Sequence, residues 1–166
     1  MRLDDKTNSS IYLLVATGFE DDFVGCCLQT LQSKGTRVMV VGMTPGETVG
    51  ALGGKISPDF SLDQASKLPL PNLIIFPGGQ TCSARMTVDP RVHRLVQAAL
   101  AQGHSLAFGR GAEGVISPKY QQNVSLKAQL LFQQNIESTE FVRSLAQLYR
   151  SISPSQALSG TREPHP

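Results

Sequence analysis

Short apolar runs alternate with amphipathic stretches along most of this chain, and this alternation limits most strongly how it can fold. Each run is bounded by polar residues, proline or glycine, and the clearest ones cover residues 11–16, 37–41, 73–76 and 105–108. Short continuous apolar runs are typical of strands that are buried on both faces of a parallel sheet. The sequence therefore predicts a doubly wound, mostly parallel α/β sheet with helices on both faces.

Helices are predicted between and after these strands. Asp89-Pro90 combines an N-cap residue with a proline in the first turn, which marks a helix start, and Gly103 closes that helix. Two other helices show an apolar stripe at helical spacing: Phe23, Val24, Cys27, Leu28 and Leu31, ending at Gly35, and Phe141, Val142, Leu145, Leu148, Tyr149 and Ile152. Smaller predicted elements are a small hairpin or an excursion of the chain over 46–55, a short helix after 109–111 that stops at 117–118, and a weaker strand over 129–132.

The chain has the length and composition of one domain, with 166 residues of which 40% are hydrophobic. We expect the domain to span residues 10–153, between flexible tails at 1–9 and 154–166. A formal charge of +2 without a basic run argues against nucleic-acid binding. The chain shows neither an apolar stretch of roughly 20 residues nor a signal-peptide pattern, so a cytoplasmic protein that does not bind membranes is expected.

Three loops follow the carboxyl ends of predicted strands, at residues 17–22, 77–85 and 109–113. In doubly wound sheets, ligands bind in the crevice outside these strand ends. We therefore expect the three loops to converge on one edge of the sheet and to hold the functional site.

Three segments in these positions resemble the ThiJ/PfpI superfamily. They are Gly18-Phe-Glu-Asp21 after the first strand, Ser57-Pro-Asp-Phe-Ser-Leu-Asp63 before the third, and Phe76-Pro-Gly-Gly79. This superfamily includes the parkinsonism-associated protein deglycase, glyoxalase-like enzymes and intracellular amidases, and the resemblance covers roughly residues 11–153. It implies a flavodoxin-like fold of the class I glutamine amidotransferase type, and a homodimer.

The resemblance also implies a catalytic arrangement that this sequence lacks. Such enzymes use a cysteine at a sharp strand-to-helix turn, here called the elbow, with a glutamate from the first loop and often a histidine. The helix N-terminus favours the thiolate, and backbone amides near Pro-Gly-Gly hold the oxyanion. In this chain Gly109 stands at the cysteine position and Phe23 at the glutamate position, and no histidine lies between the elbow and the C-terminal tail.

The glycine at the elbow has a physical explanation. The elbow residue of such enzymes has a strained backbone, which costs on the order of 1–3 kcal/mol for a residue with a side chain. Glycine adopts a positive φ without this cost. We therefore expect Gly109 to have a positive φ, so that the turn is kept while the nucleophile is lost.

Cys82 is the strongest candidate for a displaced nucleophile. It follows Gly79 by three residues in the predicted loop that faces the elbow, and Glu20 is a candidate accompanying carboxylate. The alternative is an ordinary loop thiol, because no base can be identified beside it: His104 lies at the opposite end of the sheet and His93 on an outer helix face. Of the other thiols, Cys27 is expected in the core, and Cys26 on the surface or at a subunit contact.

Arg110 has two interpretations. It can bind an anion, a carboxylate or a phosphate, at the elbow, or it can pair with Glu113, Glu20 or Asp22. The acidic residues Glu20, Asp21 and Asp22 are expected to cap the helix that follows them. The Cys and His positions show no metal-ligand spacing, and no cofactor is implied.

The sequence thus favours a ThiJ/PfpI-like domain without its elbow nucleophile that binds a protein partner or a small anionic ligand. The alternative is a cysteine-dependent glyoxalase, deglycase or amidase that uses Cys82. The candidate ligand-binding residues surround the elbow: Gly78, Gly79, Gly109, Arg110, Glu20 and Phe23.

Overall fold

The computed structural model describes residues 10–32, 36–116 and 129–152. Several predicted features lie outside the described residues: the tails at 1–9 and 154–166, the helix end at Gly35, the stop at 117–118 and the side chain of Ile152.

Six strands form one sheet in the order β5-β2-β1-β6-β7-β8, and every pair of neighbours is parallel. The four predicted core strands and the weaker one are confirmed as β1 (Ile11–Val15), β2 (Val38–Gly42), β6 (Leu73–Phe76), β7 (Ser105–Phe108) and β8 (Leu130–Phe132). Every residue of β1, β6 and β7 is buried. The edge strand β5 (Phe60–Ser61) has only two residues, too few for the sequence pattern to reveal.

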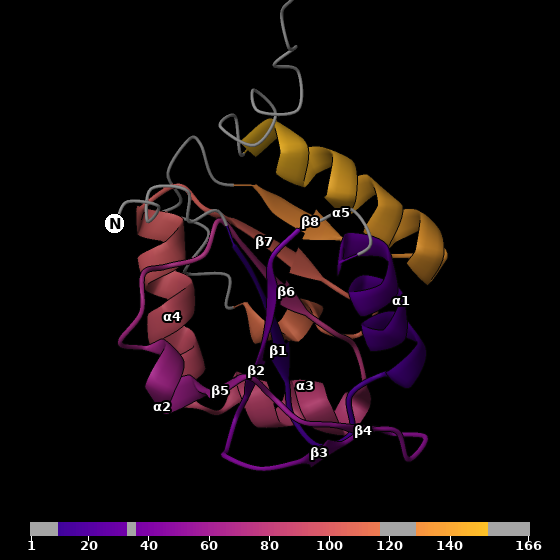
Figure 1. Ribbon diagram of the computed structural model, residues 1–166, viewed down its shortest axis with the longest axis vertical. Coiled ribbons are helices and arrows are strands. Elements are labelled where there is room, and N and C mark those ends of the chain that lie inside the picture. The colour runs from indigo at the N-terminus through magenta and orange to yellow at the C-terminus, as the bar shows by residue number, and fades with distance from the viewer. Residues whose placement is uncertain (1–9, 33–35, 117–128, 153–166) are drawn as a thin grey trace, which may run out of the picture.

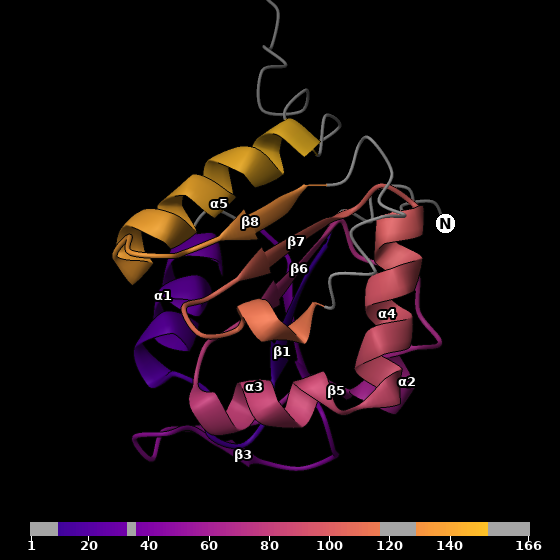
Figure 2. The same ribbon diagram turned by 180° about the vertical axis from the view of Figure 1, so that it is seen from behind.

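Helices cover both faces of this sheet. Helices α1 (Asp21–Gln32) and α5 (Ser138–Ile152) pack on one side, and α4 (Pro90–Ala101) with α2 (Leu62–Ala65) on the other (Figure 1, and from behind in Figure 2). The carboxylate of Asp89 accepts the Arg91 N–H as the N-cap of α4, and Gly103 follows that helix with a φ of 78°. The predicted doubly wound, flavodoxin-like arrangement is confirmed.

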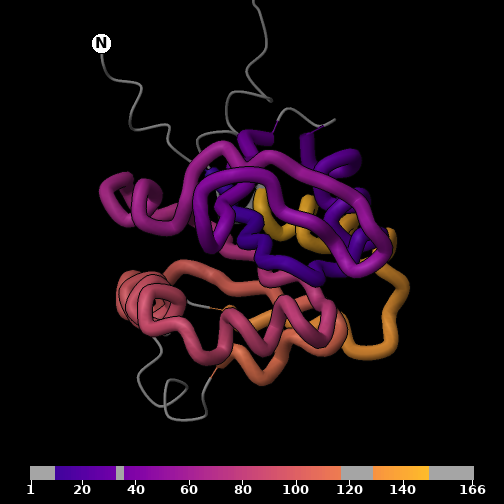
Figure 3. Tube along the Cα trace, turned by 90° about the horizontal axis from the view of Figure 1, so that it is seen from below, coloured from indigo at the N-terminus to yellow at the C-terminus, as the bar shows by residue number. Residues whose placement is uncertain are grey.

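The predicted hairpin is also confirmed, but the side chain that stabilises it was not predicted. Strands β3 (Thr48–Val49) and β4 (Lys55–Ile56) pair antiparallel below the main sheet, as Figure 3 shows from that side. The carboxylate of Asp21 accepts the backbone N–H groups of Leu52, at 2.7 Å, and Gly54, at 2.8 Å. Asp21 therefore holds the hairpin turn, where sequence reasoning expected only a helix cap.

One predicted loop is wrong. Residues 77–85 were expected to be irregular, whereas α3 (Gln80–Thr87) begins directly after Gly79, whose φ of 111° turns the chain. The helix buries only Cys82, Ser83 and Met86, and two polar or small residues among three leave little apolar signal. A shorter 3-10 helix, η2 (Glu113–Val115), forms after the turn at 109–111 as predicted.

Candidate functional site

The elbow lies where β7 ends at the carboxyl edge of the sheet. Gly109 is buried there, and its N–H donates to the carbonyl of Phe76 at 2.7 Å. Among the described residues, Gly79 and Gly111 have positive φ values but Gly109 does not. The expectation of a left-handed backbone at the elbow is therefore wrong, and the need for glycine must have another cause.

That cause is the space around Gly109. A Cβ atom at this position would lie 2.8 Å from the Gly78 nitrogen, and 3.2 and 3.3 Å from two ring carbons of Phe23. The Phe23 side chain is 0% exposed, and its ring centroid lies 6.2 Å from that of Phe141 on α5. Phe23 and Gly109 thus meet as the resemblance implied, and the ring fills the space beside the elbow.

The Pro-Gly-Gly turn is pressed equally closely against its neighbours. A Cβ at Gly78 would overlap the carbonyl oxygen of Arg110, and one at Gly79 would overlap the carbonyl oxygen of Gly18. The Gly78 carbonyl accepts the Glu20 N–H at 3.0 Å. The three loops do converge on one edge of the sheet, and their backbones approach so closely that no side chain fits at Gly78 or Gly79.

Gln133 is a site residue that sequence reasoning missed. Its side chain is fully buried, its Oε1 accepts the Arg110 N–H at 2.9 Å, and its Nε2 donates to the carbonyl of Ile136 at 2.8 Å. Nε2 also lies 3.3 Å from the Ser138 hydroxyl. Gln133 therefore ties the elbow to the start of α5. Its position directly after a strand, at the same sheet edge, was a signal that could have revealed it.

The ion pair predicted as one of two roles for Arg110 does not form within the described ranges. The Nε of Arg110 donates to the carbonyl of Gln134 and its Nη2 to that of Ile136, both at 2.9 Å. The carboxylate of Glu113 accepts the Gly111 N–H instead, and no ion pair of Arg110 occurs within the described ranges. The guanidinium thus fastens the loop after β8.

Outside the closed elbow lies an open cleft of about 560 Å³. Arg110 is the only basic residue among those that line it in the described part of the chain. Four carboxylates face it: Glu20, Asp21, Asp22 and Glu137. This excess of negative charge opposes the binding of a small anion at Arg110.

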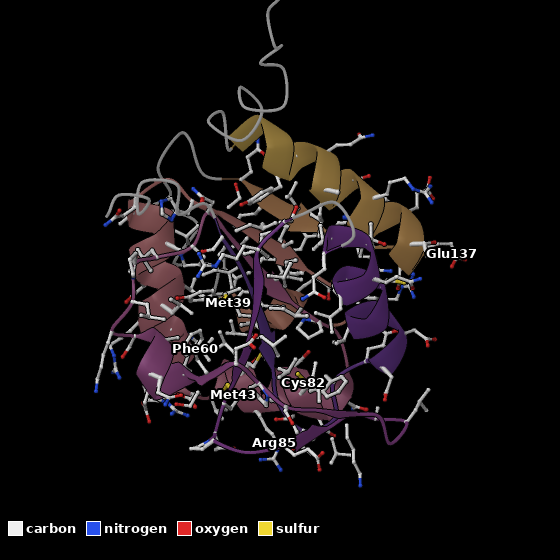
Figure 4. All side chains as sticks on the ribbon, in the orientation of Figure 1. Met39, Met43, Phe60, Cys82, Arg85 and Glu137 are labelled. Carbon is white, nitrogen blue, oxygen red and sulfur yellow. The ribbon has the colours of Figure 1, made fainter. Side chains whose placement is uncertain are left out.

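Cys82 lies on α3, in the interior of the molecule and far from Glu137 at its rim (Figure 4). Its side chain is 0% exposed. Burial raises the pKa of its thiol to about 11, although a backbone hydrogen bond from Ala16 and the charge of Arg85 act in the opposite direction. A thiol with such a pKa is protonated at neutral pH and is a weak nucleophile.

The two neighbouring thiols on α1 give no reactive group either. Cys27 is fully buried, as predicted, and burial raises its pKa far above the ordinary value. Cys26 is half-buried, and its pKa is raised by burial and by the charges of Asp22 and Glu20. Within the described residues, no group of three His, Cys, Asp or Glu side chains could hold a metal ion.

A parallel six-stranded sheet between helices, with the site at its carboxyl edge, defines a flavodoxin-like α/β domain. A model of the DJ-1/PfpI family matches residues 9–116, and this protein belongs to that family. No curated protein sequence matches the chain. None of the helices in the described ranges is long and apolar enough to cross a membrane.

Solved structures confirm the fold at low sequence identity. Oxidized Toxoplasma gondii DJ-1 is 14% identical with a TM-score of 0.71, and covers 90% of this chain and 98% of its own. Drosophila melanogaster DJ-1beta is 16% identical with a TM-score of 0.69, and the match covers 90% of this chain and 97% of the Drosophila chain. A ThiJ/PfpI domain protein from Brachyspira murdochii is 15% identical with a TM-score of 0.68, and the match covers 87% of this chain and 97% of the Brachyspira chain.

Proposed function

We propose that this DJ-1/PfpI domain is not a cysteine-dependent enzyme and acts by binding another molecule, with a protein partner as the leading candidate. The observation that carries the proposal is the contact between Phe23 and Gly109. The ring of Phe23 occupies the space beside an elbow that has no side chain of its own. The resemblance implies a cysteine at position 109 and a glutamate at position 23, where this chain has Gly109 and Phe23, so acyl transfer has no attacking group at position 109.

Cys82 does not restore this chemistry. A nucleophile needs a base within hydrogen-bond reach or a lowered pKa. The Cys82 thiol is buried within α3, and its pKa is raised to about 11. No observation therefore favours the glyoxalase, deglycase or amidase alternative over the binding role.

Activity assays test the absence of catalysis. Purified protein offered methylglyoxal or amide substrates should show no turnover above the buffer rate. The decisive variants are Cys82→Ser and its control Cys26→Ser, which removes a more accessible thiol. Turnover that Cys82→Ser abolishes and Cys26→Ser preserves would establish the enzyme and end the proposal.

The cleft outside the elbow is the surface on which we expect a partner to bind. It remains open although the elbow behind it is closed, and its carboxylates Glu20, Asp22 and Glu137 complement a basic segment of a protein. A small anion would be repelled by the same charges. The partner interaction is therefore proposed to involve lysine or arginine side chains.

Affinity capture from the native host tests this surface. We compare the wild type with Glu137→Arg, which reverses one charge at the cleft, and with Glu47→Arg, an exposed residue that does not line it. A protein retained by the wild type and by Glu47→Arg but lost with Glu137→Arg supports the proposal. Equal recovery with both variants would contradict it.

We also propose that the protein forms a homodimer, which rests on the family resemblance. Multi-angle light scattering of the purified chain should give twice the monomer mass of 17.9 kDa. A monomer at all concentrations would remove the dimer from the proposal but leave partner binding intact.

A further inference from the structure

Helix α4 carries two different stripes of residues. The first consists of Val92, Val96, Ala99 and Leu100, which are buried in the core. The second consists of Arg91, Arg94, Leu95 and Ala98, which follow one another at helical spacing and line a groove of about 280 Å³. The opposite wall is α2 with the segment 66–70. This groove lies across the sheet from α1 and α5, so it is separate from the elbow and its cleft (Figure 1).

Most of the groove wall is apolar. Side chains from α2 and the segment after it face Leu95 and Ala98 of α4, and they include Leu62, Ala65, Leu68 and Leu70. Leu68 is 39% exposed at the rim of the groove. Tyr12 of β1 also lines the groove, and its hydroxyl donates a long hydrogen bond of 3.4 Å to the Pro69 carbonyl. An apolar cavity with a few polar groups is the usual form of a small-molecule site.

Of the two arginines that line the groove, only Arg91 is paired with carboxylates. The Arg91 guanidinium binds Asp89 at 2.7 Å and Asp63 at 3.2 Å, and it also donates to the Met43 carbonyl, so both carboxylates are engaged. Arg94 has no hydrogen bond or ion pair with any residue in the part of the chain that the structure describes. One positive charge is therefore left at the edge of an apolar groove without a partner of its own.

We propose that this groove binds a small amphipathic carboxylic acid, with its hydrocarbon part between Leu68, Leu95 and Ala98 and its carboxylate on Arg94. A guanidinium and a carboxylate form two parallel hydrogen bonds, which suits a ligand with one such group. A single guanidinium balances the charge of one carboxylate but not that of a doubly charged phosphate. The groove volume lies just below the range of drug-sized sites, which favours a short acid over a long-chain lipid.

The test uses three probes with the same eight-carbon chain: octanoate, octanol and octylamine. Calorimetric titration should show octanoate binding about tenfold or more tightly than octylamine, because only the carboxylate pairs with Arg94. Amide chemical-shift changes on adding octanoate should map to residues 66–70 and to α4. Equal affinity for the acid and the amine, no binding of octanoate, or shifts at the elbow would each overturn the proposal.

Two pairs of variants separate the charge from the cavity. Arg94→Gln should weaken octanoate binding about tenfold and leave octanol unchanged, while Arg143→Gln, an exposed arginine of α5, should change neither. Ala98→Phe should fill the groove and abolish binding of both, while Gln97→Phe places the same ring on an exposed part of α4 that does not line it. Ala98 is itself exposed, so the variant is expected to fold, and its thermal unfolding checks this. If Arg94→Gln binds octanoate as the wild type does, or a folded Ala98→Phe retains it, the groove is not the site.

Discussion

The ring of Phe23 lies against Gly109 so closely that a Cβ atom at the elbow would approach two of its carbons to 3.2 and 3.3 Å. The family resemblance places a glutamate at position 23 and a cysteine at position 109. A large apolar ring has taken space beside a residue that has no side chain. Restoring either residue alone therefore does not rebuild the arrangement of the relatives.

Gly109→Ala should lower the free energy of unfolding by about 1–3 kcal/mol, because a Cβ there meets the Gly78 backbone nitrogen at 2.8 Å and the Phe23 ring. The control is Gly25→Ala on α1, where nothing lies within 4 Å of the added atom. That change should stabilise the protein by about 0.5–1 kcal/mol, since alanine is a better helix former. Urea denaturation measures both, and an equal effect of the two changes would show that the elbow has room.

The three thiols should react with iodoacetamide in an order set by burial and pKa. Cys26 is half-buried and should be labelled first at about pH 8, while Cys82 and Cys27 should react only when the protein unfolds. Mass spectrometry of the labelled peptides gives the order, and Cys26→Ser should leave almost no label in the native state. Rapid labelling of Cys82 in folded protein would instead revive the enzyme interpretation.

The burial of Cys82 should also make the free energy of unfolding depend on pH in the alkaline range. Burial raises the Cys82 pKa from 9.0 to about 11 in the folded protein. The neutral thiol therefore contributes its full stability below the unfolded value, and this contribution is lost as the pH rises toward the folded value. Unfolding in urea at increasing pH should show a smaller alkaline loss for Cys82→Ala than for the wild type, whose thiol must ionise. Parallel curves would contradict the link to Cys82.

Asp21→Ala should loosen the β3–β4 hairpin, because the Asp21 carboxylate accepts the N–H groups of Leu52 and Gly54. We expect a loss of about 1–3 kcal/mol and faster hydrogen exchange at these two amides. Asp22→Ala is the matched control, an exposed acidic neighbour with no hydrogen bond to the hairpin among the described residues. Equal hydrogen-exchange rates at these amides in the two variants would mean that the hairpin does not depend on the Asp21 carboxylate.

Asp89 should make stability depend on acidic pH. Its side-chain hydrogen bonds to Arg91 lower its pKa below the ordinary 3.8. The carboxylate's contribution is therefore present above pH 3.8 and is lost as the pH falls through the lower folded value. Asp89→Asn keeps an N-cap for α4 but loses the charge, so it should flatten the acidic part of the stability curve.

Asp89→Ala removes the cap as well and should cost about 1 kcal/mol more than Asp89→Asn at neutral pH. Guanidinium denaturation at several pH values separates the two effects. An unchanged acidic slope in Asp89→Asn would show that other carboxylates control the acid response.

Much of this fold follows from local sequence patterns. The apolar runs that form β1, β2, β6 and β7 and the Asp89-Pro90 start of α4 lie where sequence reasoning placed them. These signals are local because a buried strand or a helix cap is determined by residues close together in the chain. The convergence of three loops also followed, since parallel strands end at one edge of the sheet.

Features that depend on contacts between distant segments could not be predicted in this way. α3 was not predicted because it buries only Cys82, Ser83 and Met86, which give a weak apolar pattern, and Cys82 was therefore placed in a loop. Gln133, Arg110 and Asp21 bind backbone groups 23 to 33 residues away, and no local pattern indicates such partners.

The sequence by itself determined the mostly parallel α/β class and the family, because both rest on local residue patterns along the chain. Only the tertiary structure decided why residue 109 is glycine. The expected reason was backbone strain, but the chain does not use a positive φ there. The actual reason is steric contact with Phe23 and Gly78, and contact distances between separate segments exist only after the chain has packed.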